Sequence, residues 1–455
     1  MSADQHNPSN SNGADSIDRS EGDVNLGDRR TAWQAHHIDP ATRALLDEDA
    51  RWFLHQSMST PCLNALQGAQ GAWLTDTAGR RILDFHGNSL HQIGYGHPAV
   101  LAAMRATLDT LPFSPRRYTN RTAVDLARRL CQAAPMPGAR LLFAPGGTAA
   151  MGMALKLARL ATGRFKTVSM WDAFHGASLD AISVGGEAVF RRGMGPLLPG
   201  SEHVPPCDPG ACVFGCAGRC ALRCVDYIDY VLRKEGDVAA VIVETVRCTD
   251  VQVPPLDYYR RLRQMCDRHG ALLILDEIPI ALGRTGHLFA IERYGIEPDM
   301  IVIGKGLGGG SMPLAALIAR EGLNLGQHIS LGHYTHEKNP LACAAGLAVL
   351  DVIEQEDLLA RSRRLGQEAL DRLRRLTADL PAVKEVRGAG LLIGIELHDA
   401  DLAEAVLYRC LSAGLSFKVG QGKVLVLAPP LNVEEADLWW ALECIAQALQ
   451  QGPGA

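Results

Sequence analysis

The sequence predicts an α/β protein, with a mainly parallel sheet covered by helices on both faces and a smaller α+β domain after it. Short runs of Val, Ile and Leu without polar alternation are separated by longer amphipathic stretches. This order is typical of buried parallel strands connected by helices. The predicted strands of the large sheet are Arg140–Ala144, Thr167–Met170, Val238–Glu244, Ala271–Asp276 and Met300–Gly304, and the predicted helices include Thr148–Thr162, Val225–Lys234 and Asp257–His269.

The ends of the chain are predicted to differ from this core. Residues 1–30 are rich in Ser, Asn, Asp and Gly and have no apolar period, so we expect a disordered tail. Residues 31–100 are expected to contribute to the small domain, residues 101–335 to form the large domain, and residues 336–455 to form the small C-terminal domain. The elements predicted in this last part are helices over Leu341–Glu354 and Asp357–Leu376, strands over Leu391–Leu397 and Val424–Ala428, and a final helix through Trp439 and Leu449.

Composition excludes several classes of partner. The 455 residues carry a formal net charge of −5, which gives no electrostatic case for binding nucleic acid or an anionic membrane. No apolar run is long enough to span a bilayer, and the N-terminus is polar and acidic, unlike a secretory signal. Twelve cysteines without such a signal indicate a reducing compartment, so we expect a cytoplasmic protein.

Lys305 is the first candidate for chemistry. It follows the strand Met300–Gly304 and lies in the glycine-rich run Gly304–Gly310. Glycines allow a flat ligand to approach the backbone closely. A lysine in a partly desolvated site can lose its proton and form an imine with an aldehyde. Taken alone, the motif favours an ordinary surface lysine in a flexible loop.

Two further features, a pair of carboxylates and a glycine-rich turn, each fit both a functional and a purely structural role when considered alone. Asp276 and Glu277 end a buried strand, and buried carboxylates need partners, which a helix cap or an ion pair would also supply. The turn Pro145–Thr148 lies between a strand and a helix. Its backbone N–H groups and the helix dipole suit a phosphate, although strand–turn–helix units of this kind are common.

Together, these stretches resemble the class III (ω-)aminotransferase family of fold-type I enzymes, which depend on pyridoxal 5′-phosphate (PLP). The motifs that carry the resemblance are Leu275-Asp276-Glu277-Ile278, Gly283-Arg284-Thr285-Gly286 and Gly304-Lys305-Gly306-Leu307-Gly308-Gly309-Gly310. Their order and separation are highly specific, and the resemblance extends from about residue 50 to the end. It implies a seven-stranded sheet in the large domain, a PLP cofactor, a small-molecule amine substrate and a homodimer with shared active sites.

The resemblance also gives individual residues a role. Lys305 matches the lysine that holds PLP and moves the proton at the amine-bearing carbon, and Asp276 matches the partner of the ring nitrogen. The other implied cofactor contacts are Gly147 and Thr148 at the phosphate, Phe174 and His175 at the ring, Ile278 on its opposite face, Glu244 beside the site, and Thr335 at the phosphate of the neighbouring subunit.

Two positions depart from the transaminase pattern. Pro279 and Ile280 stand where transaminases usually have a glutamine that bonds the phenolic oxygen of the cofactor, and proline cannot form that bond. The stretch Val424–Pro430 contains no arginine, whereas many members have one there to hold substrate carboxylates. A transaminase needs such an anchor for its α-keto acid, so the loss weakens that interpretation unless Arg387 or another arginine substitutes.

A second group of motifs comprises Phe85-His86-Gly87-Asn88 with His91-Gln92, Arg116-Arg117-Tyr118-Thr119-Asn120 and Gly332-His333-Tyr334-Thr335-His336-Glu337-Lys338. These motifs resemble a lyase branch of the family, which eliminates ammonia from 1-hydroxy-2-aminoethylphosphonate to give phosphonoacetaldehyde. Arg116 and Arg117 are the candidates for binding the phosphonate, because guanidinium groups bind such oxygens in pairs; a solvated loop is the alternative. Asn88 and His91, in the segment expected to line the substrate pocket, are candidates for holding the hydroxyl, although His91 also fits a structural role. A transaminase and an inactive PLP-binding protein remain the alternative functions.

A cysteine cluster lies outside these motifs. Its members are Cys207, Cys212, Cys216, Cys220 and Cys224, and intervening Pro and Gly residues predict a loop. Zinc and iron–sulfur sites often use pairs of cysteines two residues apart, and that pairing is absent here. The sequence therefore favours free or buried thiols, with a structural metal as the alternative.

Overall fold

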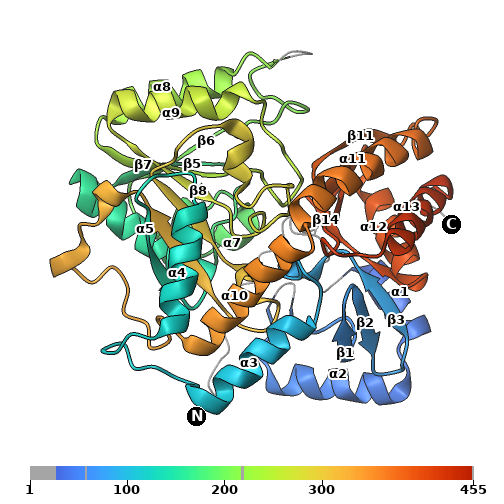
Figure 1. Ribbon diagram of the computed structural model, residues 1–455. Helices are drawn as coiled ribbons and strands as arrows, with labels where there is room; N and C mark the ends of the chain where they lie inside the picture. Colours follow the sequence, from blue (N-terminus) through green and yellow to red (C-terminus); the bar gives the residue numbers. More distant parts are fainter. Residues whose placement is uncertain (1–26, 57–58, 217–219, 453–455) are drawn as a thin grey trace, which may run out of the picture.

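The computed structural model describes residues 27–56, 59–216 and 220–452 (Figure 1). Within these residues the large sheet has seven strands in the order β4-β10-β9-β8-β7-β5-β6. Their bounds are β4 Arg140–Ala144, β5 Lys166–Met170, β6 Ser201–Val204, β7 Val238–Glu244, β8 Leu272–Asp276, β9 Met300–Ile303 and β10 Ala315–Ala319. β10 runs antiparallel to both of its neighbours, and the pairs from β9 to β6 are parallel. The prediction of a mainly parallel sheet is confirmed.

Helices cover both faces of this sheet because its strands are apolar on both sides. Ile242, Ile274 and Val302 share one buried cluster with α5 (Gly147–Thr162). The alternate residues Val241, Leu273 and Ile301 belong to the cluster on the other face, which includes α8 and α9. The remaining helices of this half are α3 Pro98–Thr110, α4 Arg121–Ala133, α6 Leu179–Val184, α7 Ala188–Arg191, α8 Arg223–Glu235 and α9 Asp257–His269.

The chain's two ends build the other half of the molecule together. An antiparallel sheet of order β11-β12-β15-β14 packs against the C-terminal helices, and a second sheet of order β1-β2-β3-β13 lies beside it. Figure 1 shows these sheets and the C-terminal helices grouped on the right, with α10 running between the two halves. The bounds are α1 Asp28–His37, α2 Pro40–Trp52, β1 Leu66–Gln70, β2 Trp73–Asp76, β3 Arg81–Asp84, α10 Pro340–Gln355, α11 Leu358–Leu376, β11 Val383–Ala389, β12 Leu392–Leu397, α12 Ala400–Ser412, β13 Leu415–Ser416, β14 Lys418–Gly420, β15 Val424–Leu427 and α13 Glu435–Gln450.

The pairing of β13 with β3 joins segments that are more than 300 residues apart in the sequence. Leu415 pairs with Leu83 and Ser416 with Asp84 in parallel register. The N-terminal strands β1, β2 and β3 therefore share one sheet with a C-terminal strand. α1 begins at Asp28, so the last residues assigned to the tail are helical, whereas residues 1–26 lie outside the described part of the chain.

Most predicted elements agree with the structure to within two residues, but two strands of the large sheet were missed. β6 is a short edge strand with the sequence Ser-Glu-His-Val, which has little β-forming character. β10 contains three alanines in five residues, and alanine is depleted in strands. Within the described residues, no helix is long and apolar enough to cross a membrane.

Candidate active site

A cavity of about 390 Å³ lies where the large domain meets the small domain. Its walls come from widely separated parts of the chain. The large domain contributes Gly147, Thr148, Phe174, His175, Gly176, Ala177, Glu244, Cys248, Thr249, Asp276, Ile278, Pro279 and Lys305, and the remainder contributes Phe85, His86, Asn88, Ser89, Lys418, Val426 and Ala428. We call the part formed by the first group, without Cys248 and Thr249, the cofactor end. The part formed by the second group together with Cys248 and Thr249 is the substrate end, since Cys248 Sγ lies 3.7 Å from Ser89 Oγ.

Lys305 projects from the end of β9 into this cavity. Its φ of 46° is unusual for a residue with a side chain, and strained backbone of this kind concentrates at functional sites. Glycine at the next position leaves room for the N-terminal segment, because a Cβ on Gly306 would lie 1.8 Å from Oε1 of Gln92. The N-terminal segment therefore packs directly against the loop that carries Lys305.

Asp276 is held by a buried histidine. It ends β8, is 1% exposed, and accepts a hydrogen bond of 2.8 Å from His175 Nδ1 through one oxygen. Its other oxygen accepts from the backbone N–H of Ile278 at 3.0 Å. Burial alone lowers the pKa of His175, but the hydrogen bond and charge of Asp276 outweigh it, so the pKa is raised. The hydrogen bond from His175 holds the Asp276 carboxyl in place at the cavity wall.

The phosphate-type turn lies where the sequence predicted it. Gly147 starts α5 and lines the cavity with Thr148, so the helix N-terminus faces the empty space. A Cβ on Gly147 would lie 2.6 Å from Cδ1 of Ile278, which is the residue expected on one face of the ring. Phe174 lines the cavity as well, and its ring packs on Phe190 with centroids 4.6 Å apart.

Glu244 ends β7 and organises two loops around the cavity. Its carboxyl oxygens accept hydrogen bonds from the backbone N–H groups of Phe174 at 3.0 Å and Cys248 at 3.2 Å. Burial raises the pKa of Glu244 to about 7, and the nearby charge of Asp276 acts in the same direction. Glu244 is therefore poised to gain or lose a proton near neutral pH.

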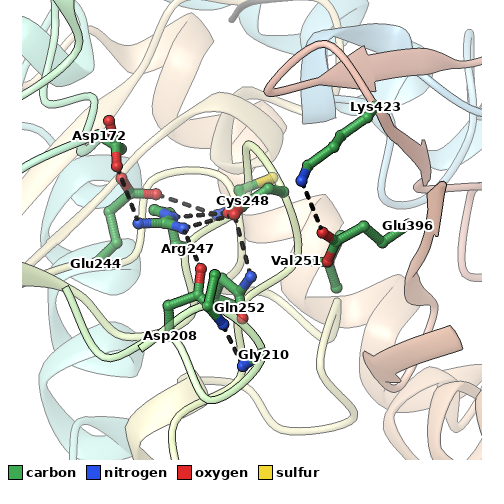
Figure 2. Close-up of polar contacts among 12 residues, drawn as sticks. Asp172, Asp208, Gly210, Glu244, Arg247, Cys248, Val251, Gln252, Glu396 and Lys423 are labelled. Carbon is green, nitrogen blue, oxygen red and sulfur yellow. Dashed lines mark hydrogen bonds and ion pairs between the residues drawn. The ribbon is translucent and has the colours of Figure 1, made fainter. Parts of the chain in front are cut away.

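Arg247 fixes the loop that carries Cys248, as Figure 2 shows. Its guanidinium donates to both carboxylate oxygens of Asp250, at 2.7 and 2.5 Å. It also lies within 3.9 Å of Asp172 and 3.7 Å of Asp208. This network connects the cavity wall to the beginning of the cysteine-rich segment and positions Cys248 and Thr249 at the substrate end.

The substrate end is formed by a strained turn after β3. Gly87, Asn88 and Ser89 have φ values of 46°, 46° and 57°, so three consecutive residues are left-handed. Asp84 holds this turn by accepting from the backbone N–H groups of His86 and Gly87, both at 3.0 Å. Burial lowers the pKa of His86 to about 4, so this ring is neutral near pH 7.

His91 lies under the turn and does not line the cavity. Its Nε2 is 3.0 Å from the Asp84 carbonyl oxygen, its ring stacks on Tyr95, and a Cβ on Gly87 would lie 2.1 Å from its Nδ1. The hypothesis that it contacts substrate is therefore corrected to a packing role. Asn88, by contrast, lines the cavity as predicted.

Arg116, Arg117 and Thr335 are exposed and do not line this cavity. Arg116 Nη2 lies 2.8 Å from Nε2 of His333, which is two residues before Thr335. Arg387 cannot serve as a substrate anchor in this arrangement. It forms ion pairs with Glu396 and Glu385 at 2.6 and 2.9 Å and donates to the carbonyl oxygens of Asp250 and Val251.

The sequence analysis missed the cavity residues Lys418, His86, Cys248 and Thr249. The weak signal for Lys418 was a cation just ahead of the strand that lacks the expected arginine. The structure places the cysteine cluster between β6 and the first turn of α8, with all five thiols free. Among residues 27–56, 59–216 and 220–452, no group of three or more His, Cys, Asp or Glu side chains is arranged to hold a metal.

The cofactor end fits PLP. A lysine amine and a carboxylate held by a buried histidine share one cavity with a helix N-terminus whose first residue, Gly147, leaves no side chain in the way. These are the groups needed to bind an aldehyde, a pyridine nitrogen and a phosphate.

Comparisons with known proteins agree with this arrangement. The family model of class III aminotransferases matches residues 55–449. The chain is 48% identical over 454 residues to the (R)-1-hydroxy-2-aminoethylphosphonate ammonia-lyase of Vibrio splendidus, covering 95% of each chain. It is 36% identical to an acetylornithine aminotransferase of Methanopyrus kandleri, covering 84% of this chain and 93% of that one. A PLP-bound amine transaminase from an uncultivated Pseudomonas species has a TM-score of 0.81 and 30% identity, covering 88% of this chain and 98% of that one.

Proposed function

Because the chain belongs to the class III aminotransferase family and is a PLP-dependent enzyme, we propose that it is an ammonia-lyase acting on 1-hydroxy-2-aminoethylphosphonate. The observation that carries this proposal is the 48% identity to the ammonia-lyase over 95% of both chains. The absence of arginine from Val424–Pro430 and the internal pairing of Arg387 add support, since neither place supplies the arginine that many transaminases use for a keto acid.

Different residues of the cavity have different roles in the proposed reaction. PLP, when bound, supplies a ring that accepts electrons from the amine-bearing carbon of the substrate. Lys305 would hold the cofactor and then move the proton at that carbon, and Asp276 would pair with the ring nitrogen. Hydroxide leaves the neighbouring carbon, and uptake of a proton and water gives phosphonoacetaldehyde and ammonia, so the atoms balance without a keto acid.

The residues of the substrate end orient the substrate for this reaction. Asn88 and Ser89 lie on the strained turn and supply polar groups beside the cavity. We assign to Asn88 the binding of the hydroxyl that leaves. The apolar side chains Val426 and Ala428 line the same region and exclude water from the reacting carbons.

The test is turnover without an amino acceptor. The PLP-loaded enzyme is mixed with racemic 1-hydroxy-2-aminoethylphosphonate alone, and ammonia and aldehyde are measured over many turnovers. We expect equimolar release of both, and Lys305→Ala is expected to lower kcat by at least about 1,000-fold because it removes both the cofactor attachment and the proton carrier. If turnover appears only after pyruvate or 2-oxoglutarate is added, the enzyme is a transaminase. Cofactor binding without any turnover would indicate an inactive PLP-binding protein.

A homodimer with shared sites is part of this proposal. Thr335 and Arg116 lie on one surface, where their segments are joined by the Arg116–His333 contact and by a 2.9 Å hydrogen bond from Asn120 to the Lys338 carbonyl oxygen. We propose that this surface faces the cofactor phosphate of the neighbouring subunit. Light scattering is expected to give twice the 49.0 kDa chain mass, and Thr335→Val is expected to weaken PLP binding about tenfold, the value of one hydrogen bond to a charged group. A monomer with full activity contradicts it.

We also propose a cytoplasmic location for the enzyme. All twelve cysteines are free, which agrees with a reducing compartment. Cell fractionation followed by detection of the protein tests this assignment.

A further inference from the structure

The substrate end requires a positive charge if it is to bind a phosphonate. A dianionic phosphonate loses its hydration in a cavity of this size, and a buried anion without a cationic partner is strongly unfavourable. The arginines suggested by the sequence, Arg116 and Arg117, do not line this cavity. Among the described residues that do, the lysines are Lys305 and Lys418, and Lys305 is engaged by the cofactor.

The register of the small sheet directs Lys418 towards the cavity. Lys418 begins β14 and is paired with Val426 of β15. Directly paired residues project from the same face of a sheet, and Val426 and Ala428, two residues apart, both line the cavity. The β15 stretch itself has no cation from Val424 to Ala428, so the positive charge on this face comes from the neighbouring strand.

Backbone hydrogen bonds hold the segment after β3 next to Lys418. Phe85 donates its backbone N–H to the Ser416 carbonyl oxygen and accepts from the Ala428 N–H, both at 2.8 Å. The first bond fastens the segment that leads to Asn88 and Ser89 to the chain two residues before Lys418, and the second fastens it to the residue that follows β15. The charge of Lys418 also reaches the cavity groups His86 and Cys248. Burial is the main cause of the lowered pKa of His86, and Lys418 acts in the same direction. Burial raises the pKa of Cys248, and Lys418 opposes that rise.

We propose that Lys418 binds the phosphonate group of the substrate and is the main determinant of specificity for that group. The hydroxyl groups of Ser89 and Thr249, which line the same end, supply further donors to the phosphonate oxygens. The inference rests on the proposed function, which brings a phosphonate into the site. It places the anion on the small-domain side and the amine at Lys305.

Binding of 2-aminoethylphosphonate, which lacks the leaving hydroxyl, tests the inference separately from turnover. The compound is titrated into the PLP-loaded enzyme, and the change in the visible absorbance of the cofactor gives its Kd. Lys418→Met is expected to raise this Kd, and the KM of the hydroxylated substrate, by about 10- to 100-fold, as expected for loss of a hydrogen bond to a charged group. Lys418→Arg is expected to stay within about fivefold of the original enzyme because the charge is kept.

A matched control lies on the same hairpin. Lys423, between β14 and β15, pairs with Glu396 at 3.2 Å, as Figure 2 shows, and does not line the cavity. Lys423→Met is expected to leave both constants unchanged. The neutral amine 1-amino-2-propanol, with a methyl group in place of the phosphonate, is expected to bind Lys418→Met and the original enzyme within about twofold, because it carries no anion to pair.

The outcomes separate the two proposals. Unchanged Kd in Lys418→Met, or an equal loss of affinity for the neutral amine, overturns the role of Lys418. If binding of 2-aminoethylphosphonate depends on Lys418 but no ammonia is released, the lyase function fails and the anion site stands. Should Lys418→Met fail to fold, the original enzyme still gives an answer: 2-aminoethylphosphonate is expected to protect Lys418 from reductive methylation and leave Lys423 reactive, and absence of that protection overturns the proposal.

Discussion

The two ends of the cavity are built in different ways. At the cofactor end, Asp276 is the last residue of one strand of the seven-stranded sheet, and Lys305 and Gly147 each follow another strand of that sheet. At the substrate end, the turn Gly87–Ser89 and Lys418 come together because β3 pairs with β13 across more than 300 residues. The cofactor end depends on local strand–turn units, whereas the substrate end depends on a long-range strand pairing. Residues at the substrate end can therefore be substituted without disturbing the binding of the cofactor.

The largest effect that tests this division is expected from Asp276. Asp276→Asn keeps the shape of the side chain but removes the carboxyl that we propose pairs with the ring nitrogen of the cofactor, so kcat is expected to fall at least about 100-fold. The cofactor absorbance is expected to persist, because Lys305 is intact. Steady-state kinetics and a visible spectrum check both points.

The neighbouring carboxyl provides the matched control for that variant. Glu277 is fully buried and accepts from Thr245 Oγ1 at 2.8 Å and from the backbone N–H groups of Ala290 and Ile291 at 2.7 and 2.9 Å. It does not line the cavity, so Glu277→Gln is expected to lower the unfolding temperature while kcat changes little. An equal loss of kcat in both variants would contradict the special role of Asp276.

The sequence predicted the cofactor end well because its residues are adjacent to their strands. The positions of Asp276 and Lys305 follow from where a buried apolar run stops, and both line the cavity. Lys418 could not be found in this way, since its place depends on the pairing of β14 with β15 and of β13 with β3. His91 was misinterpreted for a related reason: its four-residue separation from Gly87 does not reveal that the turn folds back over its ring.

Two glycine substitutions, one at each end of the cavity, are expected to have effects of intermediate size and test whether the two ends act separately. At the substrate end, Gly87→Ala places a side chain at a φ of 46° and against the His91 ring, so we expect about a tenfold higher KM with an unchanged Kd for PLP. At the cofactor end, Gly147→Ala places a methyl group 2.6 Å from Cδ1 of Ile278. The end of this side chain can move, so we expect a several-fold higher Kd for PLP and little change in KM. If each variant changes both constants equally, the two ends do not act separately.

The smallest effect concerns the pH dependence of stability. Glu244 has a pKa of about 7 in the folded protein because of its burial, against an ordinary value of 4.5. Between these two pH values the folded state binds more protons than the unfolded state. The contribution of Glu244 to the free energy of unfolding is therefore fully present below about pH 4.5 and is lost as pH rises through 7. One such group gives a slope of at most about 1.4 kcal/mol per pH unit. Glu244→Gln cannot titrate, so the unfolding temperature of its cofactor-free form is expected to fall less between pH 5 and about pH 7 than that of the original chain. An unchanged slope would mean that Glu244 is ionised throughout this range and that its bonds to the N–H groups of Phe174 and Cys248 outweigh burial.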